Sequence, residues 1–314
     1  MAEEKKTILV LGGSGYLGQF LVSSLAPLHK VAFTFHSTDE PQLPGCPQAF
    51  WVNLATGEGL HTVFDTLGPV DVVINCAAVS QPALCDKHPE AARALNVPTQ
   101  LLEAMDIHRC ATDADPLLIF FSTDQVYDGS HANWKEDEAC HPVNTYGCTK
   151  VEAEKAIQER WPNHVILRSS IIYGPQSHQP VSRSLFLQFM HRVLRMRKPT
   201  TFFVDEYRNP IYIHDIIKIV MLLVLHAHDL PTLSAHKVFN MGGPQRFSRA
   251  EMALELAAFL HMDPEGIVLS APASSVHRST PSPADISMNS SRLIEALGIE
   301  LTPFSEALSQ IPLD

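Results

Sequence analysis

The sequence predicts an α/β fold: a Rossmann-type doubly wound parallel sheet with a smaller C-terminal α/β domain. Short apolar runs alternate with helical segments over the first 175 residues, which is the pattern of βαβ units. A turn with three glycines, at residues 12–18, follows the first apolar run directly. Beyond Pro175 the alternation is lost and prolines and charged residues become denser, so a differently built second part is expected.

Seven strands are expected, six of them in the first part of the chain. The run Thr7–Leu11 is almost entirely apolar, as a strand buried on both faces of a parallel sheet should be. The other six are expected at 31–35, 50–52, 70–75, 117–121, 164–168 and 238–241.

Helices are expected where apolar residues recur at a spacing of three or four. This spacing predicts helices at 16–25, 89–105 and 146–161 in the first part, and at 185–195, 215–226, 248–260 and 290–297 in the second. The expected domains are 5–175 and 176–314. Because one strand comes as late as 238–241, residues 210–243 are expected to return partly to the first domain.

Composition and charge narrow the classes of function. The chain has 314 residues, of which 45% are hydrophobic, and a formal net charge of −11. An acidic surface repels phosphate backbones and anionic lipid heads, so neither nucleic-acid nor membrane-surface binding is expected. The apolar stretch 216–225 is interrupted by Lys218 and is much shorter than the ~20 residues of a membrane-spanning helix. The charged N-terminus does not resemble a signal peptide, so a cytoplasmic location is expected.

The cysteines and histidines do not predict a metal site. No two of the six cysteines have CxxC spacing, and the sixteen histidines are scattered. Free thiols and no bound metal are therefore expected.

The glycine turn predicts a dinucleotide site in the first domain. Gly12, Gly15, Tyr16, Leu17 and Gly18 follow the first expected strand directly and lead into the first expected helix. Such a turn lets the backbone approach a pyrophosphate, and the helix N-terminus offers free N–H groups to it. A merely structural turn is the alternative.

The residues after the second and third expected strands indicate which dinucleotide is bound. A carboxylate ending the second strand would favour NAD, but that strand runs into His36 and Ser37, and the acidic residues come later, at 39–40. NADP is therefore the preferred cofactor and NAD the alternative. Asn53 and Leu54 lie where adenine contacts are common; Asn53 could instead cap a turn.

Small residues follow the fourth strand. Cys76, Ala77 and Ala78 lie at its carboxyl end, the edge where open α/β sheets bind ligands. Small side chains would let a cofactor lie against the backbone, although close packing would also explain them.

Tyr146 and Lys150 are the sharpest candidates for catalysis. At i and i+4 on a helix they share one face. A nearby ammonium would lower the pKa of the phenol, which could then exchange a proton with a substrate oxygen. Thr123, at the end of the fifth strand, would donate a hydrogen bond to that oxygen. Tyr146 and Lys150 are also expected to contact the cofactor, with Lys150 holding its ribose hydroxyls. A chance tyrosine on a surface helix is the alternative.

These motifs together resemble the extended short-chain dehydrogenase/reductase superfamily. Within it the chain is most similar to the dTDP-4-dehydrorhamnose reductase family, its eukaryotic branch in particular. The residues that carry the resemblance lie at 12–18, 75–78, 96–97, 121–127, 144–150, 168–175, 208–215 and 282–293.

The resemblance implies an NAD(P)-binding first domain and a substrate-binding second domain. It implies reduction of the C4 keto group of a nucleotide-linked 6-deoxy sugar, with Thr123, Tyr146 and Lys150 as catalytic residues. Thr123 and Asp124 would also contact the substrate. Bacterial reductases of the family often carry Trp at the position of Ile171, so the sugar pocket is expected to differ here.

Arg208 could bind the sugar or its diphosphate, since a guanidinium suits bidentate phosphate contacts; a surface ion pair is the alternative.

The family also implies other functions. One branch is the non-catalytic regulatory β subunit of methionine adenosyltransferase, which binds NADP, and nucleotide-sugar epimerases use the same residues. The expected partners are accordingly a nucleotide sugar and either a second copy of the chain, as a homodimer, or methionine adenosyltransferase. The tail 303–314 could close the pocket or bind a partner.

Overall fold

The central element of the protein is a seven-stranded sheet. The computed structural model describes residues 5–36, 41–45, 48–181, 184–226 and 236–313. Every strand pairing in this sheet is parallel, in the order β11-β6-β5-β4-β1-β2-β3. The strands are β1 (Thr7–Leu11), β2 (Lys30–Phe35), β3 (Gln48–Trp51), β4 (Val72–Asn75), β5 (Leu117–Thr123), β6 (His164–Ser169) and β11 (Val238–Met241). The prediction of a Rossmann-type parallel sheet is confirmed.

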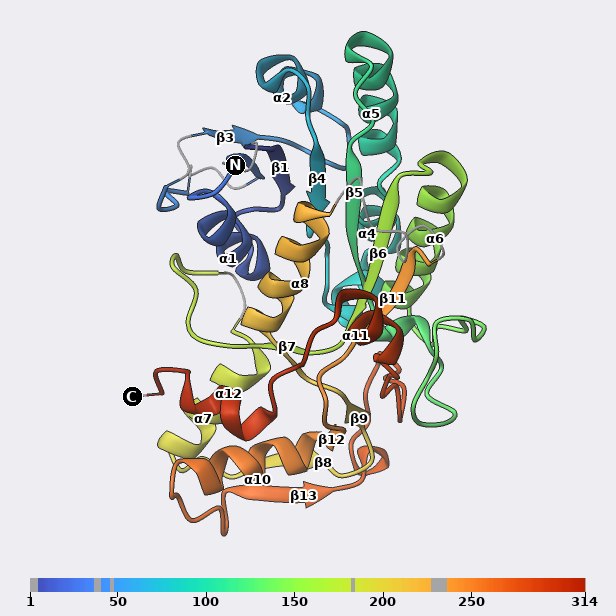
Figure 1. The fold of residues 1–314 in the computed structure, drawn as a ribbon. Coiled ribbons are helices and arrows are strands. Elements are labelled where there is room, and N and C mark those ends of the chain that lie inside the picture. The colour runs from blue at the N-terminus through green and yellow to red at the C-terminus, as the bar shows by residue number, and fades with distance from the viewer. Residues whose placement is uncertain (1–4, 37–40, 46–47, 182–183, 227–235, 314) are drawn as a thin grey trace.

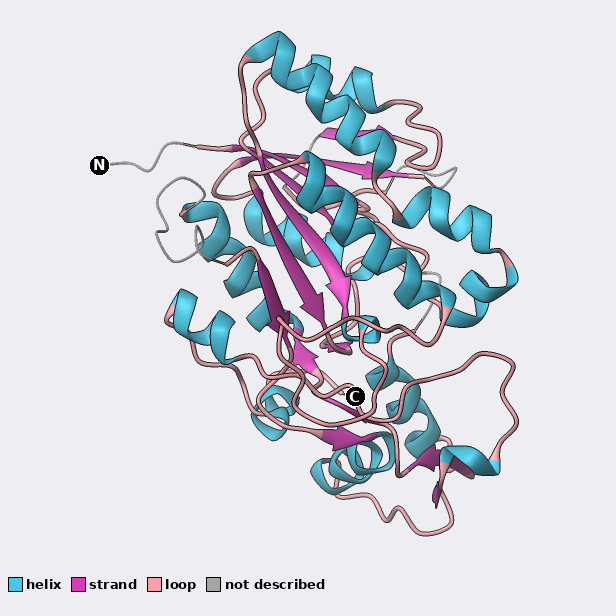
Figure 2. Ribbon diagram, turned by 90° about the vertical axis from the view of Figure 1, so that its right-hand side faces the viewer, coloured by secondary structure: helices cyan, strands magenta, loops and turns pink. Residues whose placement is uncertain are grey.

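Helices cover both faces of this sheet (Figures 1 and 2). One face packs against α1 (Tyr16–Leu25) and α8 (Ile213–Leu225) in the larger core cluster. The other packs against α2 (Leu60–Leu67), α5 (Thr99–Thr112) and α6 (Thr145–Arg160) in a second cluster. Consecutive residues of β1 alternate between the two clusters, as the period of two of a strand requires.

The prediction of one continuous helix over 89–105 is wrong. The structure has two helices, α4 (Pro89–Asn96) and α5. Pro98 separates them, because it lacks an N–H and disfavours helical backbone angles in the residue before it. Val97 accordingly has an extended backbone, with φ −89° and ψ 113°.

The second part lies beyond the carboxyl ends of the strands (Figure 2). The short strands outside the central sheet pair two by two: β7 (Ile172–Tyr173) with β10 (Ile211–Tyr212), β9 (Tyr207–Arg208) with β12 (Phe247–Ser248), and β8 (Thr200–Phe203) with β13 (Val268–Ala271). The helices of the second part are α7 (Phe186–Arg195), α10 (Arg249–Phe259), α11 (Ser291–Leu297) and α12 (Phe304–Ser309). The remaining helical segments among the described residues are α3 (Pro82–Lys87), η1 (Asp124–Val126) and η2 (Ala273–Ser275).

Residues 210–243 contain elements that pack with the first part. β11 extends the central sheet by pairing with β6, and α8 lies beside α1 (Figure 1). We therefore propose that α8 and β11 belong structurally to the first domain. The domain limits at residues 175 and 176 stay a prediction.

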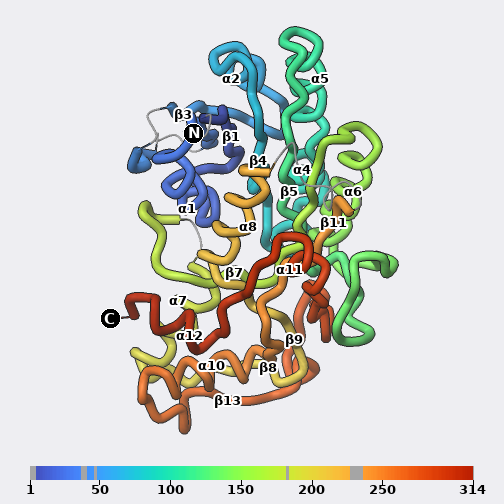
Figure 3. The backbone as a smooth tube through the Cα atoms, in the orientation of Figure 1, coloured from blue at the N-terminus to red at the C-terminus, as the bar shows by residue number. Residues whose placement is uncertain are grey.

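The C-terminal tail is part of the larger core. Its backbone passes α10 and ends near α7 (Figure 3). Phe304, Ala307, Leu308 and Ile311 are buried there, and the ring of Phe304 lies 4.9 Å from that of Tyr173. The apolar side of this tail therefore completes the protein's own interior.

Three further observations concern the part of the chain that the structure describes. None of its helices is long and apolar enough to cross a membrane. No group of three or more His, Cys, Asp or Glu side chains there is arranged to hold a metal ion. Five of the six cysteines are described, and all five are free thiols, as expected.

Candidate active site

The glycine turn brings the backbone of β1 and the start of α1 into close contact. Gly12 has a φ of +74°, which favours glycine. A Cβ on Gly18 would lie 2.3 Å from the Gly12 carbonyl oxygen, so neither position has room for a side chain. The N-cap of α1 is Gly15, which offers no side chain to the first N–H groups of the helix. The turn therefore presents bare backbone and helix N–H donors, as a pyrophosphate requires.

The ends of β1 and β4 meet at this turn. A Cβ on Gly12 would lie 2.8 Å from the Cα of Ala77. The Ala77 N–H donates to Asn75 Oδ1 at 3.1 Å, and the Cys76 thiol donates to the Leu11 carbonyl at 3.1 Å. Burial raises the pKa of this thiol to about 12. Ala78 is half-buried beside them. From β1 the chain adds β2 and β3 on one side and then β4 on the other side of β1, so the strand order reverses between β1 and β4. Rossmann folds bind nucleotides at the carboxyl ends of the strands at this point.

Two predicted cofactor residues of α1 have side chains that are engaged elsewhere. The Tyr16 hydroxyl donates to the Pro175 carbonyl at 2.8 Å, and Leu17 is buried in the larger core. What these two positions can offer a phosphate is therefore their backbone N–H groups.

The residues predicted to contact the adenosine end lie near β2 and β3. His36 is exposed, and its ring stacks on Trp51 with 5.6 Å between centroids. Ser37 lies outside the described residues. Asn53 Oδ1 accepts the Ala55 N–H at 3.1 Å, so Asn53 caps a turn, and Leu54 packs against the second core cluster.

Thr123 and Tyr146 form the centre of the candidate active site. Thr123 is the last residue of β5, and Tyr146 lies in the first turn of α6. Both side chains are buried, and they lie close enough for Thr123 to influence the pKa of Tyr146. Burial raises the pKa of the Tyr146 phenol above its ordinary value; Thr123 opposes this rise, and the nearby Asp124 adds to it.

Lys150 lies one turn further along α6. Its Nζ donates to the Phe121 carbonyl at 2.8 Å and sits 4.5 Å from the centroid of the Phe120 ring. Burial lowers the pKa of Lys150 to about 8, and the Glu154 carboxylate opposes that shift. The expectation that Lys150 lowers the pKa of Tyr146 is therefore wrong for the protein alone, because burial of the phenol outweighs every stabilising neighbour.

Asp124 and Arg208 lie close enough to interact. The Asp124 carboxyl accepts a hydrogen bond from Ser170 Oγ at 3.0 Å. Burial raises its pKa, and Arg208 is the largest opposing influence. These two predicted substrate residues thus belong to the same part of the site as Thr123, whose hydroxyl donates to Asp124 Oδ1 at 3.1 Å.

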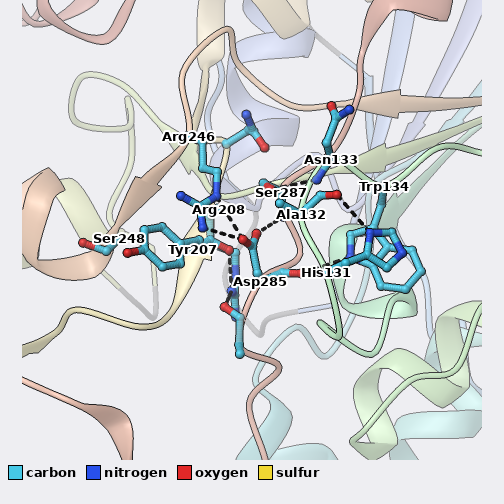
Figure 4. Close-up of polar contacts among 12 residues, drawn as sticks. His131, Ala132, Asn133, Trp134, Tyr207, Arg208, Arg246, Ser248, Asp285 and Ser287 are labelled. Carbon is cyan, nitrogen blue, oxygen red and sulfur yellow. Dashed lines mark hydrogen bonds and ion pairs between the residues drawn. The ribbon is translucent and has the colours of Figure 1, made fainter.

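Arg208 is buried, not a surface residue, and both of its terminal nitrogens donate hydrogen bonds (Figure 4). Its guanidinium donates to the carbonyls of Tyr207 at 2.6 Å, Ala284 at 3.1 Å and Pro283 at 3.0 Å. Arg208 therefore holds the segment 282–284 in place. Ile171 packs against the larger core, and its carbonyl accepts the Ile211 N–H at 2.8 Å.

A hollow of about 430 Å³ lies apart from these residues. Its lining includes Asn133, Asn209 and Arg246 but none of Thr123, Tyr146 and Lys150. Figure 4 shows part of it. The Arg246 guanidinium there lies 3.4 Å from the centroid of the Tyr207 ring and pairs with Asp285 at 2.5 Å, so its charge is already balanced.

Several residues that position the site were not predicted. Asn144 caps α6 by accepting the Gly147 N–H at 3.0 Å, and Asp86 accepts the Thr145 N–H at 3.0 Å. Glu154 and Arg168 form a buried ion pair behind Lys150. The sequence did hold a signal for Glu154, which follows Lys150 by four residues and so shares its helix face.

Comparisons with known proteins agree with this architecture. The family model described as RmlD substrate binding domain matches residues 6–312. Methionine adenosyltransferase 2 subunit beta of Danio rerio is 26% identical over 96% of this chain and 89% of its own length. dTDP-4-dehydrorhamnose reductase of Salmonella typhimurium is 30% identical over 65% of this chain and 62% of its own length.

Solved structures share the fold. The dTDP-4-dehydrorhamnose reductase of Bacillus anthracis, in complex with NADP, superposes with a TM-score of 0.80 at 18% identity, covering 98% of each chain. A hypothetical dTDP-4-dehydrorhamnose reductase of Sulfolobus tokodaii gives a TM-score of 0.77 at 24% identity, over 96% of this chain and 98% of that one.

Proposed function

The chain belongs to the RmlD substrate binding domain family, and from this premise we propose that it is an NADP-dependent reductase of a nucleotide-linked sugar. The finer proposal is reduction of the C4 keto group of a 6-deoxy sugar. The observation that carries it is the buried Thr123–Tyr146 pair at the carboxyl end of β5, with Lys150 one helical turn away.

The glycine turn supports a dinucleotide as the cofactor. Its glycines let β1, β4 and the start of α1 pack closely, and the first N–H groups of α1 have no side-chain cap. His36, not a carboxylate, follows β2, and a carboxylate there would repel the 2′-phosphate of NADP. The solved relative from Bacillus anthracis is in complex with NADP. NAD is the alternative.

Reduction of a ketone adds a hydride to the carbon and a proton to the oxygen. NADPH, when bound, supplies the hydride. Tyr146 supplies the proton: its raised pKa keeps the phenol protonated at neutral pH, as a proton donor must be. The Thr123 hydroxyl orients the same oxygen by hydrogen bonding. Lys150 lies one helical turn after Tyr146, and its side chain would hold the ribose hydroxyls of a bound cofactor.

Replacing Tyr146 tests this proposal. We expect Tyr146→Phe to abolish NADPH consumption with a dTDP-4-keto-6-deoxy sugar, because no proton donor remains, while the affinity for NADPH changes by less than about threefold. Absorbance at the nicotinamide band measures turnover, and net consumption distinguishes a reductase from an epimerase.

Tyr212→Phe is the matched control. The Tyr212 hydroxyl is buried and has no hydrogen-bond partner among the described residues, so its loss should leave turnover unchanged. A wild-type protein that binds NADPH yet never consumes it with this substrate class would contradict the reductase proposal.

A second candidate function is that of a regulatory subunit. What favours it is the similarity to methionine adenosyltransferase 2 subunit beta, which extends over 96% of this chain. In this function NADP would be a structural ligand, and the chain would bind methionine adenosyltransferase. Size-exclusion chromatography of a mixture with the methionine adenosyltransferase catalytic subunit tests it; two separate peaks in the presence of NADP would exclude this candidate.

A further inference from the structure

Glu154 is a buried carboxylate that directly backs the candidate active site. Its side chain is 4% exposed, and it lies on α6, four residues after Lys150. Residues at this spacing lie on the same face of a helix, one turn apart. An isolated charge at such a depth would be strongly unfavourable, so its contacts must be accounted for.

Both carboxylate oxygens of Glu154 are held. The Arg168 guanidinium donates from Nε to Oε1 at 3.1 Å and from Nη2 to Oε2 at 2.7 Å. The Ser122 hydroxyl donates to Oε1 at 2.5 Å. Two parallel charge-assisted bonds and one hydroxyl fix the plane of the carboxylate, so Glu154 cannot reorient without breaking them.

The remaining nitrogen of the Arg168 guanidinium, Nη1, is also hydrogen-bonded. It donates to the Tyr127 hydroxyl at 2.9 Å and to the Glu136 carbonyl at 3.2 Å. The Tyr127 hydroxyl donates to Asn240 Oδ1 at 2.8 Å. Residues from β6, from β11 and from the segment after β5 therefore fix the position of Glu154 relative to the sheet.

The surroundings of Lys150 provide little other compensation for its charge. Within the described part of the chain, the titratable groups that influence it are Glu154 on α6, Cys76 after β4 and Cys85 on α3. Burial raises the pKa of both thiols, so they are neutral at physiological pH. Phe120 and the Phe121 carbonyl contribute a ring face and one hydrogen bond. Among these groups, the Glu154 carboxylate has the largest influence favouring the charged form of Lys150.

We propose that Glu154 is a positioning residue of the active site: clamped by Arg168 and Ser122, it is the fixed counter-ion that keeps the buried Lys150 side chain ionised. The effect on the charge of Lys150 stands on the shared helix face of the two residues and on their neighbouring partners in β5, since Lys150 donates to the Phe121 carbonyl and Glu154 accepts from Ser122. Its consequence for cofactor affinity rests on the proposed function.

The test measures the ionisation of Lys150 directly. Competitive labelling with acetic anhydride across a pH series, read by mass spectrometry of the Lys150 peptide, gives the midpoint of its titration. We expect Glu154→Gln to lower this midpoint by about 1 unit or more, the size of the effect of one close opposite charge. Glu154→Asp keeps the charge and should restore most of the shift.

Glu152→Gln is the matched control. It removes the same charge from the same helix, but Glu152 is partly exposed and paired with Arg93 on the surface at 3.0 Å. The Lys150 midpoint should stay at its wild-type value. If Glu154→Gln does not fold, the double variant Glu154→Gln/Arg168→Met removes both buried charges together and should lower the midpoint in the same direction.

A midpoint in folded Glu154→Gln, or in the double variant, that equals the wild-type value would overturn the proposal. A purely structural role for Glu154 would lower the unfolding temperature without moving this midpoint. NADPH affinity over the same pH series is a separate readout, which should decline at lower pH in Glu154→Gln than in the wild type. A wild type that binds no NADPH would refute the proposed function, whereas the labelling result would still decide the role of Glu154.

Discussion

Buried ionisable side chains gather at the carboxyl end of β5. Lys150, Glu154, Asp124 and Arg168 are all nearly inaccessible to solvent. Burial opposes the ionisation of Lys150 and Asp124, whose pKa values move accordingly. Such groups cost stability and are retained where they serve a site.

Lys150→Met should therefore stabilise the protein while weakening NADPH binding. The pKa of Lys150 is lowered from 10.5 to about 8, so the folded state disfavours its proton. Between pH 8 and 10.5 the unfolded chain binds more protons than the folded chain, so the free energy of unfolding of the wild type rises with pH. Below about pH 8 the full cost of burying the charged lysine lowers the stability of the wild type. We expect a gain of about 1–3 kcal/mol at neutral pH, measured by chemical denaturation.

The pH dependence provides the check on that variant. The gain should shrink as the pH rises above 8, because the wild-type lysine then loses its charge. Lys155→Met, at an exposed position on the same helix, should change neither stability nor NADPH affinity. A loss of stability in Lys150→Met would show that burial of this charge is fully compensated.

At the scale of elements, the start of α6 is tied to three other segments. Asn144 Nδ2 donates to Gln125 Oε1 at 2.9 Å and to the Pro281 carbonyl at 3.2 Å, while Asp86 holds the N–H of Thr145. Tyr146 follows in the same turn. The orientation of the candidate proton donor thus depends on how this helix begins.

Asn144→Ala should reduce both stability and turnover. Loss of the helix cap costs about 1 kcal/mol, and the freed first turn no longer holds Tyr146 against Thr123. Ser248→Ala removes the cap of α10, where Ser248 and Glu251 form a capping box. It should cost a similar amount of stability, read by chemical denaturation, and leave turnover unchanged; equal turnover in the two variants would argue against a role for the Asn144 cap in catalysis.

At the scale of the molecule, residues near the C-terminus pack in the same hydrophobic core as residues of α1 near the N-terminus. Phe304 packs against Tyr173 and Phe247, and Thr302 donates both its N–H and its hydroxyl to the Asp215 carboxylate at 2.8 Å. The tail thereby joins α8 and α10 within one apolar cluster that also contains α1. The two parts of the chain should accordingly unfold together.

Phe304→Ala should lower the free energy of unfolding by about 3–5 kcal/mol, the cost of emptying a buried aromatic site. A single thermal transition at lower temperature is the expected result. Phe189→Ala, at a position where the ring is 39% exposed, should cost clearly less. A small loss for Phe304→Ala would mean that the tail is dispensable for the core.

The local pattern of the sequence was sufficient for most elements. The strand 238–241 and the helix 16–25 were predicted with their observed ends, because hydrophobic periodicity and turn residues act over a few positions. The break at Pro98 was also encoded locally. The short strands β7, β9, β10 and β12 were not predicted, since two residues carry no periodic signal.

The sequence by itself determined the parallel sheet and the glycine turn at its edge. It also determined that Thr123 ends a strand and that Tyr146 and Lys150 follow on the next helix. The tertiary structure decided what surrounds them. The Glu154–Arg168 pair joins residues 14 positions apart, and Arg208 holds Pro283 from 75 positions away. Whether the pKa of a phenol rises or falls depends on burial and on such distant partners, so it follows from packing in three dimensions and not from spacing along the chain.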